Sequence, residues 1–209
     1  MFRRLAAAYA PLPRVTAGRP LLDVLVETIL SQNTSDANSH RAFINLKRTL
    51  GSWPRIAKAP VPAIERAIRS GGLSKTKAPR IRRVLELIVR REGRLSLERL
   101  YSMKTPEIRA YLTSLPGVGA KTAACVLLFG MGRPVMPVDT HVERVARRLG
   151  WASPRLPVER IGPVLEPWIS PRNMLAMHLA LVQHGRRTCL ARRPRCAQCL
   201  LVPFCPFPR

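Results

Sequence analysis

The sequence predicts an all-α fold. Hydrophobic residues recur with helical periodicity along the chain, and no convincing alternation of apolar and polar residues indicates a strand. Aromatic residues make up only 5% of the chain while hydrophobic residues make up 46%, so aliphatic side chains and alanine must fill the core. Such a core favours helices over a β-sandwich. The 209 residues suffice for one large domain or for two small lobes.

The expected helices are bounded by recognisable start and stop residues. Thr105 and Pro106 give a cap residue followed by proline at the first helical position, and Thr140 with Glu143 matches a capping box. Gly51 is expected to end the helix that precedes it. In chain order we expect helices at 20–31, 35–50, 61–70, 77–91, 105–114, 120–129, 140–150, 157–168 and 171–184, with a short helical turn at 96–101.

The charge of the chain is strongly positive. Lys and Arg total 36 against 12 Asp and Glu, which gives a formal net charge of +24. Such a chain repels itself unless a polyanion neutralises it. Nucleic acid is therefore the expected partner. An anionic membrane is a distant second, because no basic amphipathic stretch is long enough to dominate.

The N-terminal segment faintly imitates a signal peptide. Its apolar stretch breaks at Pro11 and Pro13 and no clear cleavage signal follows, so we expect a surface or docking helix there. No apolar run approaches the ~18 residues that a membrane span requires. We expect a cytoplasmic, nucleoid-associated protein without a targeting signal, and we expect it to be a monomer.

The segment Leu115-Pro116-Gly117-Val118-Gly119 separates two expected helices and indicates a helix–hairpin–helix. The two glycines allow a tight turn that brings backbone N–H groups close to a phosphate, and the next helix adds the positive end of its dipole. Contacts of this kind carry no base information. An ordinary helix–helix connection is the alternative. The predicted DNA contacts here are Pro116, Gly117, Val118, Gly119, Lys121 and Thr122.

Lys121 and Asp139 are the candidate catalytic residues. Lys121 falls in the first turn of the second hairpin helix, where the dipole disfavours a cation and favours the neutral, nucleophilic amine. A phosphate-binding lysine is the equal alternative. Asp139 precedes a helix for which Thr140 already provides a cap, so we interpret Asp139 as not needed for capping. A competing Asp cap is the alternative.

Four of the five cysteines lie close to the C-terminus with the spacing C-x6-C-x2-C-x5-C. They are Cys189, Cys196, Cys199 and Cys205. A disulfide framework is not expected, because Cys125 is the only other cysteine and no secretion signal is present. The thiolates instead indicate tetrahedral zinc or a [4Fe–4S] cluster, and the single C-x2-C unit favours the cluster. Arg192, Arg193 and Arg195 in the same loop suggest a DNA-contact surface, whereas Cys125 is expected in the core.

Several segments together resemble one known family. They are L-P-G-V-G-A-K-T-A at 115–123, V-D-T-H-V at 138–142, H-G-R-R-T-C at 184–189 and the cysteine tail. The chain resembles the endonuclease III family of the helix–hairpin–helix DNA glycosylase superfamily over residues 20–207. The resemblance implies two helical lobes that flank a DNA-binding cleft. Residues 21–132 would form a six-helix domain with the hairpin, and residues 1–20 and 133–209 an iron–sulfur domain.

The resemblance also implies a reaction. A bifunctional DNA glycosylase and AP lyase of base excision repair would remove oxidised pyrimidines from double-stranded DNA and cleave 3′ to the abasic site by β-elimination. Lys121 would attack C1′ of the damaged nucleotide, and Asp139 would stabilise the oxocarbenium-like sugar. The four tail cysteines would bind a [4Fe–4S] cluster.

Other site residues follow less directly from the resemblance. The family inserts a polar side chain, usually Gln, into the gap left by the flipped base. Counting back from Asp36 places Asn33 there, beside Gln32, so which of the two fills the gap stays open. A wedging leucine corresponds to Leu73, with core packing as its alternative. His141 and Asp36 would either line the pocket or brace it.

Two other functions compete with this interpretation. A sister glycosylase would remove mismatched thymine, uracil or adenine. Lys121 favours the bifunctional type, and adenine-removing relatives usually carry an extra C-terminal domain. A non-catalytic, zinc-stabilised DNA-binding module belongs to another class, and the combination of Lys121 with Asp139 argues against it.

Overall fold

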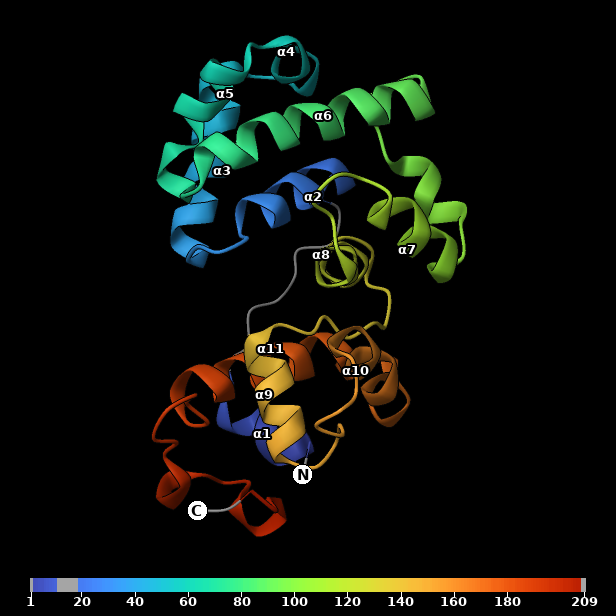
Figure 1. Ribbon diagram of the computed structural model, residues 1–209. Coiled ribbons are helices and arrows are strands. Elements are labelled where there is room, and N and C mark those ends of the chain that lie inside the picture. The colour runs from blue at the N-terminus through green and yellow to red at the C-terminus, as the bar shows by residue number, and fades with distance from the viewer. Residues whose placement is uncertain (1, 11–18, 208–209) are drawn as a thin grey trace. The chain divides into compact units, whose positions relative to one another are not determined.

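The computed structural model describes residues 2–10 and 19–207, and over these ranges it is helical and contains no strand (Figure 1). The all-α prediction is confirmed. Pro11 and Pro13, which we expected to interrupt the first apolar stretch, lie outside the described residues. Within the described ranges, no helix combines the length and the apolar character needed to cross a membrane.

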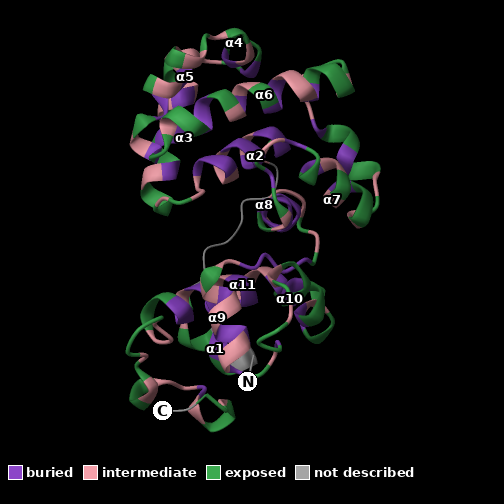
Figure 2. Cartoon of the chain, in the orientation of Figure 1, coloured by how far each residue is buried: buried purple, intermediate pink, exposed green. Residues whose placement is uncertain are grey.

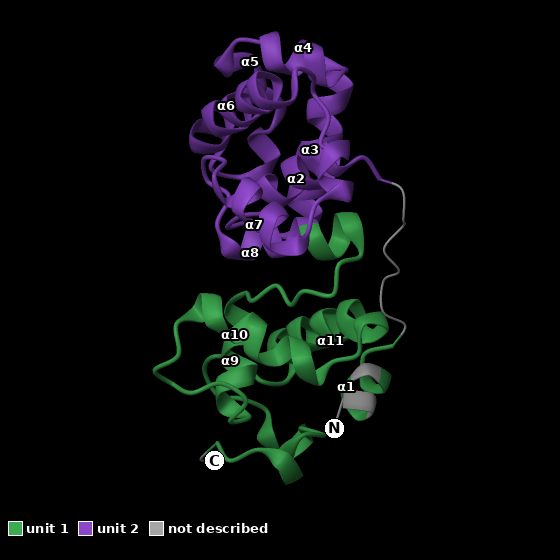
Figure 3. Cartoon of the chain, turned by 90° about the vertical axis from the view of Figure 1, so that its right-hand side faces the viewer, with its two compact units in different colours: residues 1–17, 127–209 green, residues 18–126 purple. Residues whose placement is uncertain are grey.

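The chain divides into two compact units (Figure 3). We call residues 18–126 the hairpin unit, and residues 1–17 with 127–209 the cysteine unit. The division falls between Val126 and Leu127, inside a helical segment, whereas the sequence-based boundary lay between 132 and 133. Each unit is described by itself.

The hairpin unit is organised around a central apolar helix. Its helices are α2 (Leu21–Leu30), α3 (Asp36–Leu50), α4 (Trp53–Lys58), α5 (Val61–Ala67), α6 (Ser74–Glu92), α7 (Thr105–Thr113) and α8 (Ala120–Cys125), with 3₁₀ segments at Arg69–Gly71 and Glu98–Ser102. α2 contacts α3, α6 and α8, and seven of its ten residues are buried (Figure 2). A helix that is apolar on nearly all sides belongs inside its domain.

Helix ends in this unit follow local sequence rules with one exception. Gly51 (φ 79°) and Gly93 (φ 72°) end α3 and α6 in backbone conformations that glycine favours. Thr105 was predicted to be the cap residue of α7, and this prediction is wrong. It is the first residue of α7, and the N–H of Lys104 before it donates to Glu107 Oε2 at 2.7 Å. The short α4 was not predicted.

The cysteine unit is built around α11. Its helices are α1 (Phe2–Ala8), α9 (Thr140–Arg148), α10 (Val158–Leu165) and α11 (Met174–Arg187), and a π-helical turn at Val126–Gly130 continues α8 into the unit. 3₁₀ segments lie at Glu166–Trp168, Pro171–Asn173, Cys196–Gln198 and Val202–Phe204. α11 contacts α9 and α1, and Leu5 of α1 is fully buried. The N-terminal segment is therefore a docking helix.

Candidate functional site

The hairpin turn requires a glycine at one position for internal reasons. Gly117 has a φ of 74°, which L side chains rarely adopt, and a Cβ added there would overlap the Cδ and Nε atoms of Arg80. Arg80 therefore lies directly against the turn. The fold alone accounts for this glycine.

Gly119 is different, because the fold does not demand it. Its φ of −85° is ordinary, and a Cβ added there would meet no atom within 4 Å. The residue is exposed and acts as the N-cap of α8, whose first N–H groups have no partner inside the helix. The open space beside donors of this kind suits the close approach of an anion such as a phosphate.

The other hairpin residues divide into exposed and buried side chains. Val118 is 3% exposed, and its N–H donates to the carbonyl of Leu115 within the turn. Thr122 is 4% exposed, and its hydroxyl accepts a hydrogen bond from Gln32. Pro116 is half-buried. Direct contact with a ligand is therefore easiest at the two glycines and at Lys121.

Lys121 is exposed in the first turn of α8, two residues after Gly119. The helix begins here because the glycine turn ends, and residues 122–128 are buried, so the helix is fixed against the core on its other side. The ammonium group gains nothing from the helix dipole at this end. Because Lys121 is exposed and directly follows the hairpin turn, its amine is accessible to a substrate.

Asp139 caps α9, so our interpretation that it is not needed for capping is wrong. Its Oδ1 accepts hydrogen bonds from the N–H groups of His141 at 2.9 Å and Val142 at 2.8 Å. Thr140 is the first helical residue and forms no capping box. Asp caps a helix at least as well as Thr, and the extended backbone at residue 139 suits a cap. The cap fixes the orientation of the carboxylate and leaves Oδ2 outside both bonds.

Glu143, the other member of the predicted capping box, binds elsewhere. Its Oε1 accepts from Nε of Arg147 at 3.0 Å, one turn further along α9. The prediction failed because two residues capable of capping are adjacent, and the helix begins one residue earlier than expected.

The turn after α2 is held to the hairpin by Gln32. Its Nε2 donates to the carbonyl of Gly117 at 2.9 Å and to Oγ1 of Thr122 at 3.1 Å, and its Oε1 accepts from Arg80 at 2.9 Å. Asn33, by contrast, is exposed and has a φ of 53°. Gln32 is thus occupied inside the unit, whereas Asn33 projects from a strained turn.

Leu73 does not pack in the core, so that alternative is wrong. The residue is 54% exposed. Its φ is 50°, and the φ of Gly72 before it is 65°. A bulky residue in this region is a genuine conformational outlier, which costs about 1–3 kcal/mol. The chain accepts strain here to present an apolar side chain to solvent.

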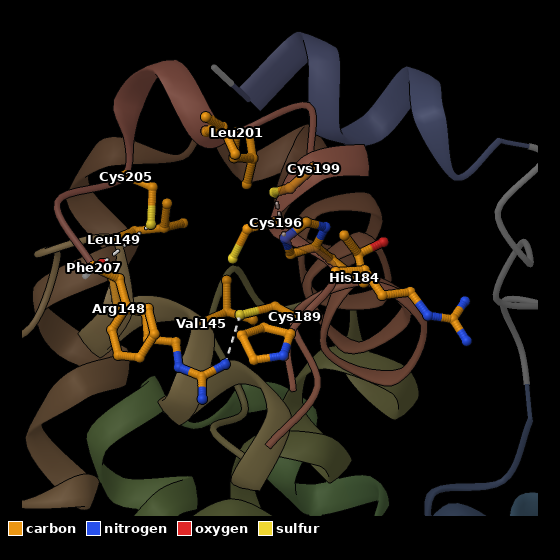
Figure 4. A pocket seen from close by; sticks show the side chains of 14 residues that line it. Val145, Arg148, Leu149, His184, Cys189, Cys196, Cys199, Leu201, Cys205 and Phe207 are labelled. Carbon is orange, nitrogen blue, oxygen red and sulfur yellow. Dashed lines mark hydrogen bonds between the residues drawn. The ribbon is translucent and has the colours of Figure 1, made fainter. Parts of the chain in front are cut away.

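The four tail cysteines line one pocket, and Figure 4 shows their side chains pointing into it. They are Cys189, Cys196, Cys199 and Cys205, and all four are free thiols. Among the described residues, no three His, Cys, Asp or Glu side chains lie close enough together to hold a single metal ion. The donor set at this pocket is four cysteine sulfurs, which is the ligand chemistry of zinc sites and of iron–sulfur clusters alike.

Arg148 of α9 supports one side of this pocket. Its Nη1 lies 3.3 Å from Cys189 Sγ and also donates to the carbonyl of Leu190 at 2.7 Å, while Nη2 donates to that of Ala191 at 3.0 Å. Sγ of Cys205 donates to the Arg148 carbonyl at 3.5 Å. One arginine thus holds both ends of the cysteine loop and places positive charge beside a thiol.

His184 of α11 supports the other side. Its Nε2 lies 3.7 Å from Cys199 Sγ, and its Nδ1 lies 2.8 Å from the hydroxyl of Tyr9. Burial lowers the pKa of His184 to about 4, so the ring is neutral at pH 7. Burial, with the neighbouring cysteines, raises the pKa of the Cys199 thiol. A bound metal would offset that effect, because coordination deprotonates thiols.

Comparisons with known proteins agree with this geometry. Residues 26–169 match the model of the HhH-GPD superfamily base excision DNA repair protein. Endonuclease III of Sulfolobus acidocaldarius is 34% identical over 191 residues, which cover 90% of this chain and 83% of that protein. A putative DNA glycosylase of Arabidopsis thaliana is 43% identical over 136 residues, 65% of this chain, but this chain spans only 46% of that protein.

The chain belongs to the HhH-GPD superfamily of base excision DNA repair proteins. A solved structure of a trapped endonuclease III–DNA covalent intermediate, an estranged-adenine complex, superposes with a TM-score of 0.82 at 27% identity. The match covers 98% of this chain and 92% of that one. The resemblance to endonuclease III, the assignment as a DNA glycosylase and DNA as the partner are thereby confirmed.

The structure gives the positions of the remaining predicted residues of this glycosylase but does not establish their roles. Arg192 and Arg193 are exposed in the cysteine loop, and Arg193 has a φ of 49°. His141 is half-buried, with Nδ1 3.1 Å from Arg144, and a Cβ on Gly185 would meet its Cβ at 2.7 Å. His141 is thus braced by its own unit. Asp36 is exposed at the start of α3, and Cys125 is buried as predicted.

Sequence reasoning missed several residues that organise the glycosylase site. Arg80 contacts Gln32, 48 positions away, and lies against Gly117. Arg148 contacts Cys189, which lies 41 positions further along the chain. His184 contacts Cys199, which lies 15 positions further along. The sequence motifs gave no role to these residues, although His184 opens the H-G-R-R-T-C segment, because each acts through a partner that only the folded chain brings near.

Proposed function

We propose that this glycosylase is bifunctional: it removes oxidised pyrimidines from double-stranded DNA and cleaves 3′ to the abasic site by β-elimination. The observation that carries the proposal is the exposed amine of Lys121 in the first turn of α8, beside the open backbone at Gly119. A hairpin of this kind binds backbone phosphate, and an amine at its end would lie near the adjoining sugar. The relatives named endonuclease III support the same assignment.

The chemistry assigns one role to each candidate residue. The lone pair of Lys121 Nζ attacks C1′, and the bond between C1′ and the base breaks with its electron pair leaving on the base. Asp139 stabilises the positive charge that develops on the sugar, and its capped carboxylate needs no reorientation to do so. Nζ then loses a proton, the C1′–O4′ bond opens with its electron pair on O4′, and O4′ takes up a proton, which leaves a protonated Schiff base between Lys121 and C1′. This Schiff base acidifies the C2′ proton. Loss of that proton breaks the C3′–O bond.

Asn33 rather than Gln32 is proposed to fill the gap left by the extruded nucleotide. Gln32 already donates to the hairpin and accepts from Arg80, whereas Asn33 is exposed on a positive-φ turn. Leu73 is proposed to wedge the opposite strand, which its 54% exposure and strained backbone support. Both residues lower the cost of holding a base outside the stack.

The cysteine pocket is proposed to hold a [4Fe–4S] cluster through its four thiolates. The donor set is all sulfur, and Arg148 places a positive charge 3.3 Å from one of the sulfurs. When bound, the cluster supplies rigidity to residues 189–205. That loop carries Arg192 and Arg193, which are proposed to contact DNA phosphates. We also propose a cytoplasmic monomer that works on chromosomal DNA.

A base-release screen tests the proposal. Duplex oligonucleotides containing thymine glycol, dihydrouracil, uracil or thymine mispaired with guanine would be incubated with the protein, and strand breaks scored with and without hot alkali. We expect alkali-independent breaks at thymine glycol and dihydrouracil. Alkali-dependent breaks confined to uracil or mispaired thymine would instead identify a monofunctional mismatch glycosylase. The absence of any base release would leave only DNA binding.

A further inference from the structure

Lys77 is a buried amine in the first turn of α6. It is 2% exposed, and its Nζ donates to the carbonyl of Leu30 at 2.6 Å and to that of Gly71 at 2.9 Å. Burial lowers the pKa of Lys77, and the charge of Arg80 adds to the effect, so the site disfavours a charged amine. A buried amine of this kind is tolerated only where hydrogen bonds compensate it. The structural role of Lys77 is therefore to hold these two carbonyls.

Each carbonyl lies just before one of the two strained turns. Leu30 is the last residue of α2 and precedes the turn with Asn33, whose φ is 53°. Gly71 ends the Arg69–Gly71 segment and precedes Leu73, whose φ is 50°. The backbone N–H of Lys77 also donates to the carbonyl of Leu73 at 2.9 Å. Strained backbone conformations persist only where the surrounding structure holds them in place. Lys77 contacts both turns and can therefore hold both.

The two turns also lie against each other and against α3. A Cβ added at Gly72 would lie 3.9 Å from Thr34 Oγ1, which belongs to the first turn. A Cβ added at Gly71 would lie 2.9 Å from the Cβ of Ala42 in α3. The backbone at Gly71 is thus packed closely on α3, and Thr34 of the first turn lies near Gly72 of the second.

We propose that Lys77 is a positioning residue for base extrusion: it holds the turn of Asn33 and the turn of Leu73 in one arrangement, so that both side chains enter DNA together. The proposal rests on the roles given to Asn33 and Leu73 above. Lys77 is buried and acts through backbone carbonyls alone, so it takes no part in the attack at C1′. Its loss should impair extrusion and leave the later chemistry intact.

The test compares base release from two substrates under single-turnover conditions. Thymine glycol would be placed in a fully paired duplex and in a short mismatched bubble, where extrusion costs less. We expect Lys77→Met to slow release about tenfold or more on the paired duplex and less than about threefold on the bubble. Lys77→Gln keeps N–H groups, so its rate of release on the paired duplex should lie between the rates of Lys77→Met and the wild type. If Lys77→Met does not fold, Lys77→Gln takes its place.

A matched control separates positioning from stability. Ile88 is fully buried in the same helix, about 16 Å along its axis from Lys77. Ile88→Ala should lower Tm without changing the ratio of rates on the two substrates, when all variants are assayed well below their Tm. An unchanged ratio for Lys77→Met, whatever its Tm, would overturn the proposal.

Two further variants separate this inference from the function on which it rests. Leu73→Ala and Asn33→Ala should each show the same selective loss on paired DNA. If neither does, the roles proposed for those side chains fail. If both do and Lys77→Met does not, only the inference about Lys77 fails. Added to the Leu73→Ala/Asn33→Ala pair, Lys77→Met should cause little further loss, and a fully additive loss would contradict its action through these turns.

Discussion

The turns around the hairpin and the cysteine pocket are built in opposite ways. In the hairpin unit, Gln32 reaches Gly117 over 85 positions and Lys77 reaches Leu30 over 47, so single side chains hold loops that are far apart in sequence. In the cysteine unit, one stretch, 189–205, provides all four thiols. The first region is ordered by the protein's own hydrogen bonds, whereas we propose that the second, besides its contacts with Arg148, depends on a group that the thiols bind. The two should therefore fail under different treatments.

Loss of one thiol should have the largest effect, and it should stay local. Cys199→Ser would remove a cluster ligand, so we expect loss of bound iron and of visible absorption, and faster amide hydrogen exchange over 189–205. Exchange in α2 and α6 should remain close to that of the wild type. Equal deprotection of both units would show that the hairpin region is not ordered independently.

Asp139 allows charge and capping to be separated. Asp139→Asn keeps a cap of equal quality but removes the carboxylate charge, so Tm should hold while base release slows by about 10²-fold or more. Asp139→Ala should lose the same activity and also about 1 kcal/mol of stability, because the N–H groups of His141 and Val142 lose their acceptor. Thermal melts and single-turnover rates would be measured together. A normal rate for Asp139→Asn would leave Asp139 as a cap only.

The two hairpin glycines sharpen the contrast within one turn. Gly119→Ala meets nothing in the free protein, so Tm should be unchanged, while affinity for duplex DNA should fall about tenfold as the Cβ obstructs a phosphate. Gly117→Ala combines a φ of 74° with a clash against Arg80 and should lower Tm. Melting curves and fluorescence anisotropy would show both effects. Unchanged DNA affinity for Gly119→Ala would argue against phosphate binding at that position.

The smallest effect is expected from the cysteine loop surface. Replacing Arg192 and Arg193 by Ala should reduce the slope of log affinity against log salt by about 1 for each phosphate that the loop no longer neutralises, with little change in lesion preference. Titrations at several salt concentrations would measure it. An unaltered slope would mean that the loop does not contact DNA.

Much of the fold, and the parts of the site that depend on local sequence, could be predicted. Gly51 and Gly93 end helices because glycine adopts positive φ, and the hairpin was visible from its two glycines. The Asp139 cap was misjudged because Thr140 beside it is also a good cap. Long-range hydrogen bonds could not be predicted, because no spacing in the sequence relates Lys77 to Leu30. Residues that order the turns are therefore visible only in the folded chain.

The proposed bifunctional activity depends above all on the amine of Lys121 forming the covalent intermediate. Borohydride trapping on duplex DNA containing thymine glycol tests it directly, with wild type and Lys121→Gln compared at equal DNA occupancy. We expect the wild type to give a stable protein–DNA adduct, and Lys121→Gln to bind DNA but give none. Continued trapping by Lys121→Gln would show that another amine attacks C1′, and base release without trapping by the wild type would exclude an amine nucleophile.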